Sequence, residues 1–214
     1  MQTLSLESLV AKIPDAASLM IGGFMGVGTP ERLIDELVRQ GKRDLTVIAN
    51  DTAMVGRGIG KLITAKLVRK VIASHIGLNP ETQQKMLSGE MEVELVPQGT
   101  LIERIRAAGY GLGGILTPTG IGTVVEQGKR KLEVDGREYL LETPLAADFA
   151  LVEAFLADYL GNLTYALTAR NFNPVIAMAA KTVIVDPEHI VPVGTLSPDH
   201  VMTPAPLVDY LVAR

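Results

Sequence analysis

Short runs of branched apolar residues alternate with helix-like patterns along the first half of the chain. Runs of this kind are typical of strands buried in a parallel sheet. Between the first two runs, apolar residues recur at helical spacing over Leu33–Val38, and Gly41 is placed to end that helix. The four predicted strands are Leu19–Ile21, Leu45–Ala49, Val68–Ser74 and Glu92–Val96.

A second helix is predicted after the fourth strand. Thr100 and Glu103 have the spacing of a capping box, and an apolar stripe over Leu101–Ile105 follows before Gly109. Strands and helices that alternate in this way, joined by right-handed crossovers, form a doubly wound sheet that binds ligands at the carboxyl ends of its strands. We therefore predict an α/β fold with an open, mostly parallel sheet.

The second half of the chain has a different pattern. Lys131–Val134 and Glu138–Leu141 flank Asp135-Gly136, a strong signal for a two-residue hairpin. No low-complexity linker and no repeat interrupts the sequence, so we expect residues 1–214 to form one domain with this antiparallel hairpin as an addition. The remaining predicted elements are strands at Asp148–Ala154 and Thr182–Val185 and a short helix at Asn173–Ala180.

Composition narrows the classes of function. The net charge of −4 argues against a nucleic-acid partner, since binding to phosphates needs a basic surface. The chain has no cysteine, which excludes disulfides, thiolate catalysis and Cys-based metal sites. No basic segment precedes an apolar run at the N-terminus and no run of about 18 apolar residues occurs. We expect a cytoplasmic protein without a membrane segment.

The loop Gly22–Pro30 is the most informative stretch, with four glycines in seven residues between a predicted strand and a predicted helix. Thr29 is placed to cap that helix and Pro30 suits its first position. Free N–H groups and the positive end of a helix dipole would then favour an anion or an oxyanion. A P-loop lysine is absent, and Glu31 replaces the third glycine of a dinucleotide fingerprint. A plain strand-to-helix turn without a ligand is the alternative.

Three more polar segments follow predicted strands, at residues 50–52, 74–77 and 97–100. Asn50 and Gln98 are neutral amides that can donate hydrogen bonds to an oxyanion at any pH, although each could be an ordinary loop amide. His75 is a possible base, but no carboxylate is evidently spaced to orient it. His189 and His200 show no metal-ligand spacing, so no metal site is predicted.

Three features of the sequence remain open. The chain offers no convincing nucleophile, because it has neither a Gly-x-Ser-x-Gly elbow nor a carboxylate pair. The segment Gly109–Gly122 holds six glycines and is too long for an ordinary turn, so it could cover a substrate or contact a subunit. Met25, Val27 and Met54 could line an acyl pocket or belong to the core.

Asp15–Pro30 resembles the first signature of the family I CoA-transferases, an Asp followed by three apolar positions and Gly-Gly-Phe-x-x-x-Gly-x-Pro. The sequence departs from it at Ala16, which stands where a small turn residue is usual. Further resemblance runs over nearly the whole chain and is most like the α subunits of bacterial acetate/acetoacetate CoA-transferases. It is carried by Leu45–Thr52, Pro97–Arg106, Thr117–Thr123 and Ala169–Pro174.

The resemblance implies a ping-pong transfer of CoA between an acyl-CoA and a short carboxylic acid. A glutamate of a β subunit, in a Glu-Asn-Gly setting that this chain lacks, would be the nucleophile, in an assembly expected to be α2β2. Gln98 and Asn50 would support the oxyanion and the acyl site. A CoA thioester would be the substrate, with no tightly bound cofactor. The residues implied to contact CoA or its acyl end are Gly22, Gly23, Phe24, Met25, Gly26, Val27 and Gly28.

Three other interpretations are compatible with parts of the sequence. Related transferases that use succinate or 3-oxoadipate share most of these motifs. A stand-alone ligand-binding module built on the same sheet would bind as a monomer and exchange no acyl groups. A sugar-phosphate isomerase-like enzyme would need its own acid/base pair, and none is convincing here.

Overall fold

The computed structural model describes residues 1–214 and is built around a nine-stranded sheet with the order β1-β12-β11-β9-β2-β3-β4-β5. Every neighbouring pair along this order is parallel, and β10 adds to β9 in the antiparallel sense. The predicted open, mostly parallel α/β sheet is confirmed. The main-sheet strands are β1 (Gln2–Leu4), β2 (Ser18–Ile21), β3 (Leu45–Asp51), β4 (Val68–His75), β5 (Glu92–Leu95), β9 (Ala147–Asp158), β10 (Leu163–Thr164), β11 (Ala180–Val191) and β12 (Tyr210–Val212).

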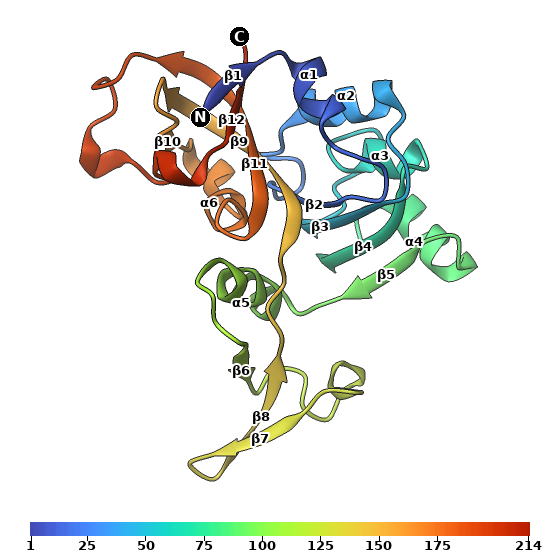
Figure 1. Cartoon of the computed structure of the whole chain (residues 1–214). Helices are drawn as coiled ribbons and strands as arrows, with labels where there is room; N and C mark the ends of the chain where they lie inside the picture. Colours follow the sequence, from blue (N-terminus) through green and yellow to red (C-terminus); the bar gives the residue numbers. More distant parts are fainter.

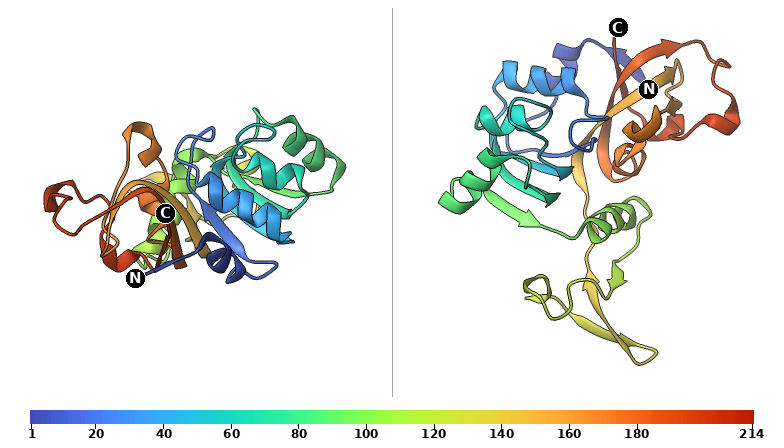
Figure 2. Two further views of the ribbon diagram at one scale, coloured as in Figure 1. Left: turned by 90° about the horizontal axis from the view of Figure 1, so that it is seen from above. Right: turned by 180° about the vertical axis from the view of Figure 1, so that it is seen from behind.

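Helices cover both faces of this sheet (Figures 1 and 2). One core cluster joins α1, α2 and α3 to the sheet, and a second joins α5 and α6 to the opposite face. Because side chains alternate along a strand, Leu151 of β9 enters the first cluster while Ala150 and Val152 enter the second. The helices are α1 (Leu6–Ala11), α2 (Glu31–Gln40), α3 (Gly60–Thr64), α4 (Pro80–Ser88), α5 (Gln98–Gly109) and α6 (Asn173–Ile176).

Two predicted helix starts are wrong. Helix α2 begins at Glu31 with Pro30 as its N-cap and has no capping side chain, because Thr29 is buried against Gly23 instead. Helix α5 begins at Gln98, directly after Pro97, so Thr100 lies inside the helix and its buried hydroxyl has no partner. The predicted end of α2 is confirmed, since Gly41 is its left-handed C-cap.

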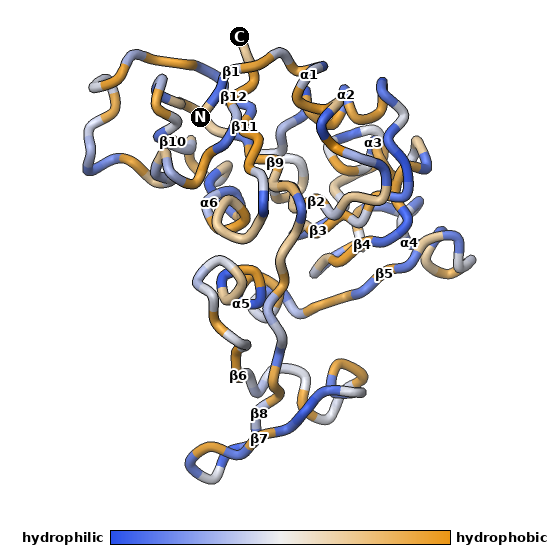
Figure 3. Tube along the Cα trace, in the orientation of Figure 1, coloured by the Kyte–Doolittle hydropathy of each residue, from blue (hydrophilic) through white to orange (hydrophobic).

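An arm formed by residues 110–146 extends away from the main sheet (Figure 1). It contains a second, antiparallel sheet of β6 (Ile115–Thr117), β8 (Arg137–Glu142) and β7 (Lys131–Val134), in that order. The predicted hairpin turn is present, with positive φ at both Asp135 and Gly136. A hydrophilic stretch of the arm leads into β7 (Figure 3). Strand β6 lies within the glycine-rich Gly109–Gly122 segment, for which the sequence predicted a loop.

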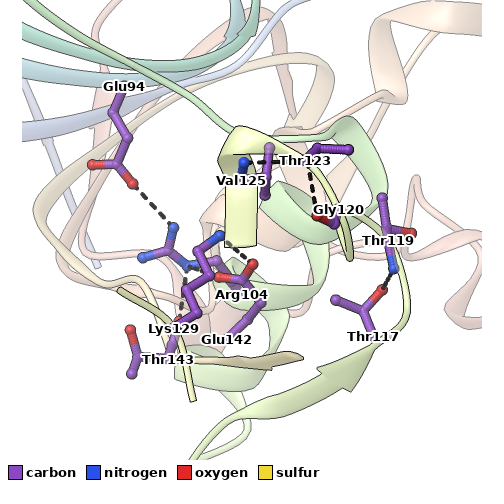
Figure 4. Close-up of polar contacts among 10 residues, drawn as sticks. All are labelled: Glu94, Arg104, Thr117, Thr119, Gly120, Thr123, Val125, Lys129, Glu142 and Thr143. Carbon is purple, nitrogen blue, oxygen red and sulfur yellow. Dashed lines mark hydrogen bonds and ion pairs between the residues drawn. The ribbon is translucent and has the colours of Figure 1, made fainter. Parts of the chain in front are cut away.

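Charged contacts fasten the root of the arm to the body (Figure 4). Arg104 of α5 donates to Thr143 O (2.9 Å) and pairs with Glu94 of β5 (3.2 Å). Glu142, nearly fully buried, pairs with Lys129. The Arg104–Thr143 bond, together with an Arg104–Glu142 approach of 4.0 Å, joins the arm to helix α5, while the Lys129–Glu142 pair lies within the arm.

Candidate active site at the carboxyl end of the sheet

A cavity of about 690 Å³ opens where β2 and β3 end, between the glycine loop, helix α5 and the segment that leads into α6. The loops after neighbouring parallel strands meet at this edge, which is where open α/β sheets bind ligands. The wall is mostly apolar, with a few polar side chains among the hydrophobic ones. The lining residues are Phe24, Met25, Val27, Asn50, Met54, Arg57, Gln98, Ile102, Arg106, Thr168, Asn171, Phe172 and Val175.

Asn50 and Gln98 are joined in a chain of hydrogen bonds that starts at a buried carboxylate. Asp51 accepts a bond from Asn50 Nδ2 (2.8 Å), and Asn50 Oδ1 accepts one from Gln98 Nε2 (2.8 Å). A carboxylate only accepts, so Asp51 fixes which way the Asn50 amide points, and Asn50 in turn orients Gln98. Asn50 is 1% exposed, whereas Gln98 is exposed at the cavity.

Asp51 also holds the backbone around this chain. Its carboxylate accepts the N–H groups of Met25 (3.0 Å) and Ala53 (2.7 Å). Both residues have positive φ, which non-glycine residues adopt at a cost. Asp51 therefore ties the tip of the glycine loop to the end of β3 and to the Asn50 amide.

The glycine loop is packed against the segment 169–173, which comes from the far end of the sequence. Asn171 accepts the N–H of Gly23 (3.0 Å) and donates to Val27 O (2.9 Å), and Asn173 Nδ2 donates to Gly28 O (2.8 Å). A Cβ on Gly22 would lie 1.8 Å from Asn173 Oδ1. A glycine is therefore needed at position 22 because the Asn173 amide fills the space of a side chain.

The loop is less open to an anion than the sequence suggests. The N–H groups of Gly23 and Met25 donate to Asn171 and Asp51, and those of Phe24 and Val27 donate to each other's carbonyls at 2.9 Å. The N–H groups of Gly26 and Gly28 have no protein acceptor.

A smaller hollow of about 330 Å³ adjoins the cavity and shares Phe24, Met25, Asn50 and Gln98 with it. Ser74 lies here and donates to Asn50 O at 2.7 Å. His75 also lines this hollow, and no carboxylate partner orients its imidazole. The structure thus places His75 beside the amide chain and outside the larger cavity.

A titratable group lies behind the glycine loop. Burial raises the pKa of Glu153 to about 7, and the negative charges of Glu188 and Asp186 add to this effect. The backbone N–H of Glu153 donates to Asn173 Oδ1 (3.1 Å), the amide that packs on Gly22. The backbone of Glu153 is therefore linked to the glycine loop through the side chain of Asn173.

Two further observations concern the whole chain. No group of three or more His, Asp or Glu side chains is arranged to hold a metal ion. None of the helices combines the length and the apolar character required to cross a bilayer.

Comparison with known proteins identifies the family. The model of the Coenzyme A transferase family matches residues 3–214, which is almost the entire chain. The chain belongs to the coenzyme A transferase family. The resemblance inferred from the signature and the four further segments is thereby confirmed.

Two curated relatives cover nearly the full length. The chain is 58% identical over 209 residues to the acetate CoA-transferase subunit alpha of Escherichia coli (strain K12), covering 98% of this chain and 95% of that one. It is 52% identical over 209 residues to the acetoacetyl-CoA:acetate/butyrate CoA transferase alpha subunit of Clostridium acetobutylicum, covering 98% and 96%.

A solved structure shows the same fold. The acyl-CoA transferase YdiF of Escherichia coli O157:H7, in a thioester complex with CoA, matches all of this chain with a TM-score of 0.88 and 28% identity. The match covers 47% of the YdiF chain, so this chain spans just under half of that protein.

Of the residues that the sequence singled out, Asn50, Gln98 and the loop side chains Phe24, Met25 and Val27 line the cavity, whereas Gly22, Gly23, Gly26 and Gly28 do not. Sequence reasoning missed Arg57, Arg106 and Phe172 as lining residues. The Ala169–Pro174 motif carried the signal for the last of these, but nothing in its composition says that it folds back onto Gly22–Gly28.

Proposed function

We propose that this chain is the α subunit of a short-chain acyl CoA-transferase that moves CoA between an acyl-CoA and a carboxylate such as acetate or acetoacetate. The observation that carries the proposal is a cavity that presents an exposed amide, Gln98, held by a buried one, Asn50, and offers no nucleophile. The near-full-length identity of 58% to an acetate CoA-transferase subunit alpha supports the acid specificity.

The nucleophile is then a glutamate of a β subunit that closes over this edge of the sheet. Its carboxylate attacks the thioester carbonyl and CoA leaves as a thiolate. The thiolate next attacks the acyl–glutamyl anhydride to form a glutamyl-CoA thioester and release the first acid. The second acid reverses these steps, so the same β-subunit carboxylate is regenerated and no redox partner is needed.

Gln98 acts on the charge that each attack creates. Every step places negative charge on a carbonyl oxygen, and a preorganised N–H donor lowers the energy of that oxyanion. One N–H of the Gln98 amide is committed to Asn50, which leaves the other for the substrate. Asn50 is the positioning residue behind it.

The glycine loop, Gly22–Gly28, holds the CoA or acyl end of the substrate. Phe24, Met25 and Val27 supply apolar surface to the cavity for a short acyl chain, and the backbone N–H groups of Gly26 and Gly28 remain free to donate. CoA enters as a substrate and not as a tightly bound cofactor. The proposed assembly is α2β2.

The experiment is a transfer assay with acetoacetyl-CoA and acetate, followed as acetyl-CoA formation. This chain, its β partner and the co-purified pair are tested in parallel. The proposal predicts acetyl-CoA only from the pair. Activity of this chain alone would contradict a nucleophile in the partner, and inactivity of a properly assembled pair with every short acid tested would contradict the proposed substrate class.

A further inference from the structure

The cavity carries positive charge although the chain as a whole is acidic. Two arginines, Arg57 and Arg106, are among its lining residues, and no Asp or Glu is. The net charge of the chain is −4. A concentration of cations in a mostly apolar cavity of an acidic protein indicates an anionic ligand.

The two arginines are not equivalent. Arg106 Nε donates to both carboxylate oxygens of Glu103, at 3.2 and 3.1 Å, so part of its charge is already matched. Arg57 makes no ion pair and its guanidinium donates no hydrogen bond within the chain. A guanidinium has five N–H donors in a fixed plane, which suits the paired oxygens of a carboxylate or a phosphate.

The carboxylate that contacts Gly58, the residue after Arg57, is engaged with other groups. Glu31 accepts the N–H of Gly58 (2.9 Å) and pairs with Lys61 (2.7 Å), and Lys61 also pairs with Asp35 (2.6 Å). These carboxylates are therefore committed to Lys61 and to the backbone.

The glycine loop holds the Arg57 side chain over the cavity. A Cβ on Gly26 would lie 2.8 Å from Arg57 Nε and 3.3 Å from its Cδ and Cγ. The stem of Arg57 thus lies across Gly26, directly beside the loop residues Met25 and Val27 that line the cavity. This packing keeps an unpaired cation in the wall of the cavity.

We propose that Arg57 binds anionic oxygens of the substrate in this cavity, either a phosphate group of CoA or the carboxylate of the free acid. This inference rests on the proposed transferase function and adds a specific anion-binding residue to it. Arg57 acts in binding and takes no part in the oxyanion chemistry assigned to Gln98.

The test compares Arg57→Gln and Arg57→Lys in the purified α–β pair, with initial rates measured against acetoacetyl-CoA, acetoacetyl-pantetheine and acetate. Loss of a hydrogen bond to a charged group predicts a KM higher by about 10-fold or more for Arg57→Gln, with kcat changed much less. Arg57→Lys keeps the charge and is expected to recover part of the affinity. Arg43→Gln, an exposed change of equal charge at the opposite end of the sheet, is the matched control.

The substrates separate the two sources of the anion. A higher KM for acetoacetyl-CoA but not for acetoacetyl-pantetheine, which lacks the nucleotide phosphates, identifies the phosphate. A higher KM for acetate with either thioester identifies the carboxylate. Unchanged KM values for both substrates, or a loss of activity that follows loss of the α–β pair on size exclusion, would overturn the proposal.

A calorimetric titration of the pair with CoA and with acetate keeps the two proposals distinguishable. If the wild-type pair binds these ligands but transfers nothing, the proposed function fails while the Arg57 comparison still stands. Equal binding of both ligands by Arg57→Gln and wild type would overturn the role of Arg57 whatever the transfer activity.

Discussion

Gln98 Nε2 lies 2.8 Å from Asn50 Oδ1, and this contact joins an exposed amide on helix α5 to a buried amide at the end of β3. The two residues are far apart in sequence, and the bond holds the Gln98 side chain at the cavity. Because Asp51 in turn fixes Asn50, the donor that faces the substrate is set before the substrate arrives. Preorganisation of this kind is what makes an oxyanion donor effective.

Replacing Gln98 with Ala is expected to slow CoA transfer by the α–β pair about 100- to 1,000-fold, because one oxyanion donor is lost. The measurement is kcat with acetoacetyl-CoA and acetate, with assembly checked by size exclusion. Gln84→Ala, an exposed glutamine on α4, serves as the control and should leave kcat unchanged. Wild-type turnover by an assembled Gln98→Ala pair would remove Gln98 from the mechanism.

Asn50→Ala should lower kcat through Gln98. If Asn50 acts only by positioning Gln98, its removal has little further effect once Gln98 is absent. The losses of kcat from the two substitutions should therefore not add. The expected result of a double-mutant cycle is that Asn50→Ala costs much less rate in the Gln98→Ala background than in wild type. Additive losses would mean that Asn50 contacts the substrate independently.

Gly22→Ala tests the contact between the glycine loop and the segment 169–173. Its Cβ would lie 1.8 Å from Asn173 Oδ1, so the amide must move, and we expect a loss of about 1–3 kcal/mol in the free energy of unfolding. Gly99→Ala is the matched control, because no atom lies within 4 Å of its Cβ position and it sits in helix α5. Denaturant unfolding should show the first variant destabilised and the second not.

Glu153→Gln should change how stability depends on pH. The pKa of Glu153 is about 7 in the folded chain against 4.5 for the free group, so the folded state binds the proton more tightly. The stabilisation of the folded state by this bound proton is therefore fully present below pH 4.5 and is lost as the pH rises to about 7. In thermal unfolding, the stability of the variant relative to wild type should increase from pH 4.5 to about 7 and stay constant at higher pH. A stability difference between variant and wild type that does not vary with pH would contradict the raised pKa of Glu153.

The sequence predicted the central part of the fold because β2, β3 and most of β4 are short apolar runs that end at polar or glycine residues. In β5, glutamates alternate with Val93 and Leu95, as suits a strand at the edge of the sheet. The edge strand β1 and its neighbour β12 were not predicted, since three residues each give no periodic signal. The predicted helix starts were wrong for two reasons. The Thr29 side chain packs against Gly23 and does not cap α2. Helix α5 begins directly after Pro97, two residues ahead of Thr100. That residues 1–214 form one domain stays a prediction.

Asn50 and Gln98 could be proposed from the sequence because each comes directly after, or shortly after, a predicted strand. Contacts between distant segments could not be predicted in this way. Nothing local to residues 169–173 indicates that its asparagines fill the space beside Gly22, and nothing local to Arg57 indicates that it lies across Gly26. The role of the arm stays a prediction, although Arg104 joins its root to the body through Thr143 and Glu142.

The central claim is that this chain orients the substrate while its partner carries the nucleophile. The most direct measurement is intact-mass spectrometry of both subunits after the assembled pair is incubated with acetoacetyl-CoA and quenched before an acid acceptor is added. The account predicts a covalent CoA adduct on the partner subunit and an unmodified mass for this chain. A CoA or acyl adduct on this chain would contradict it.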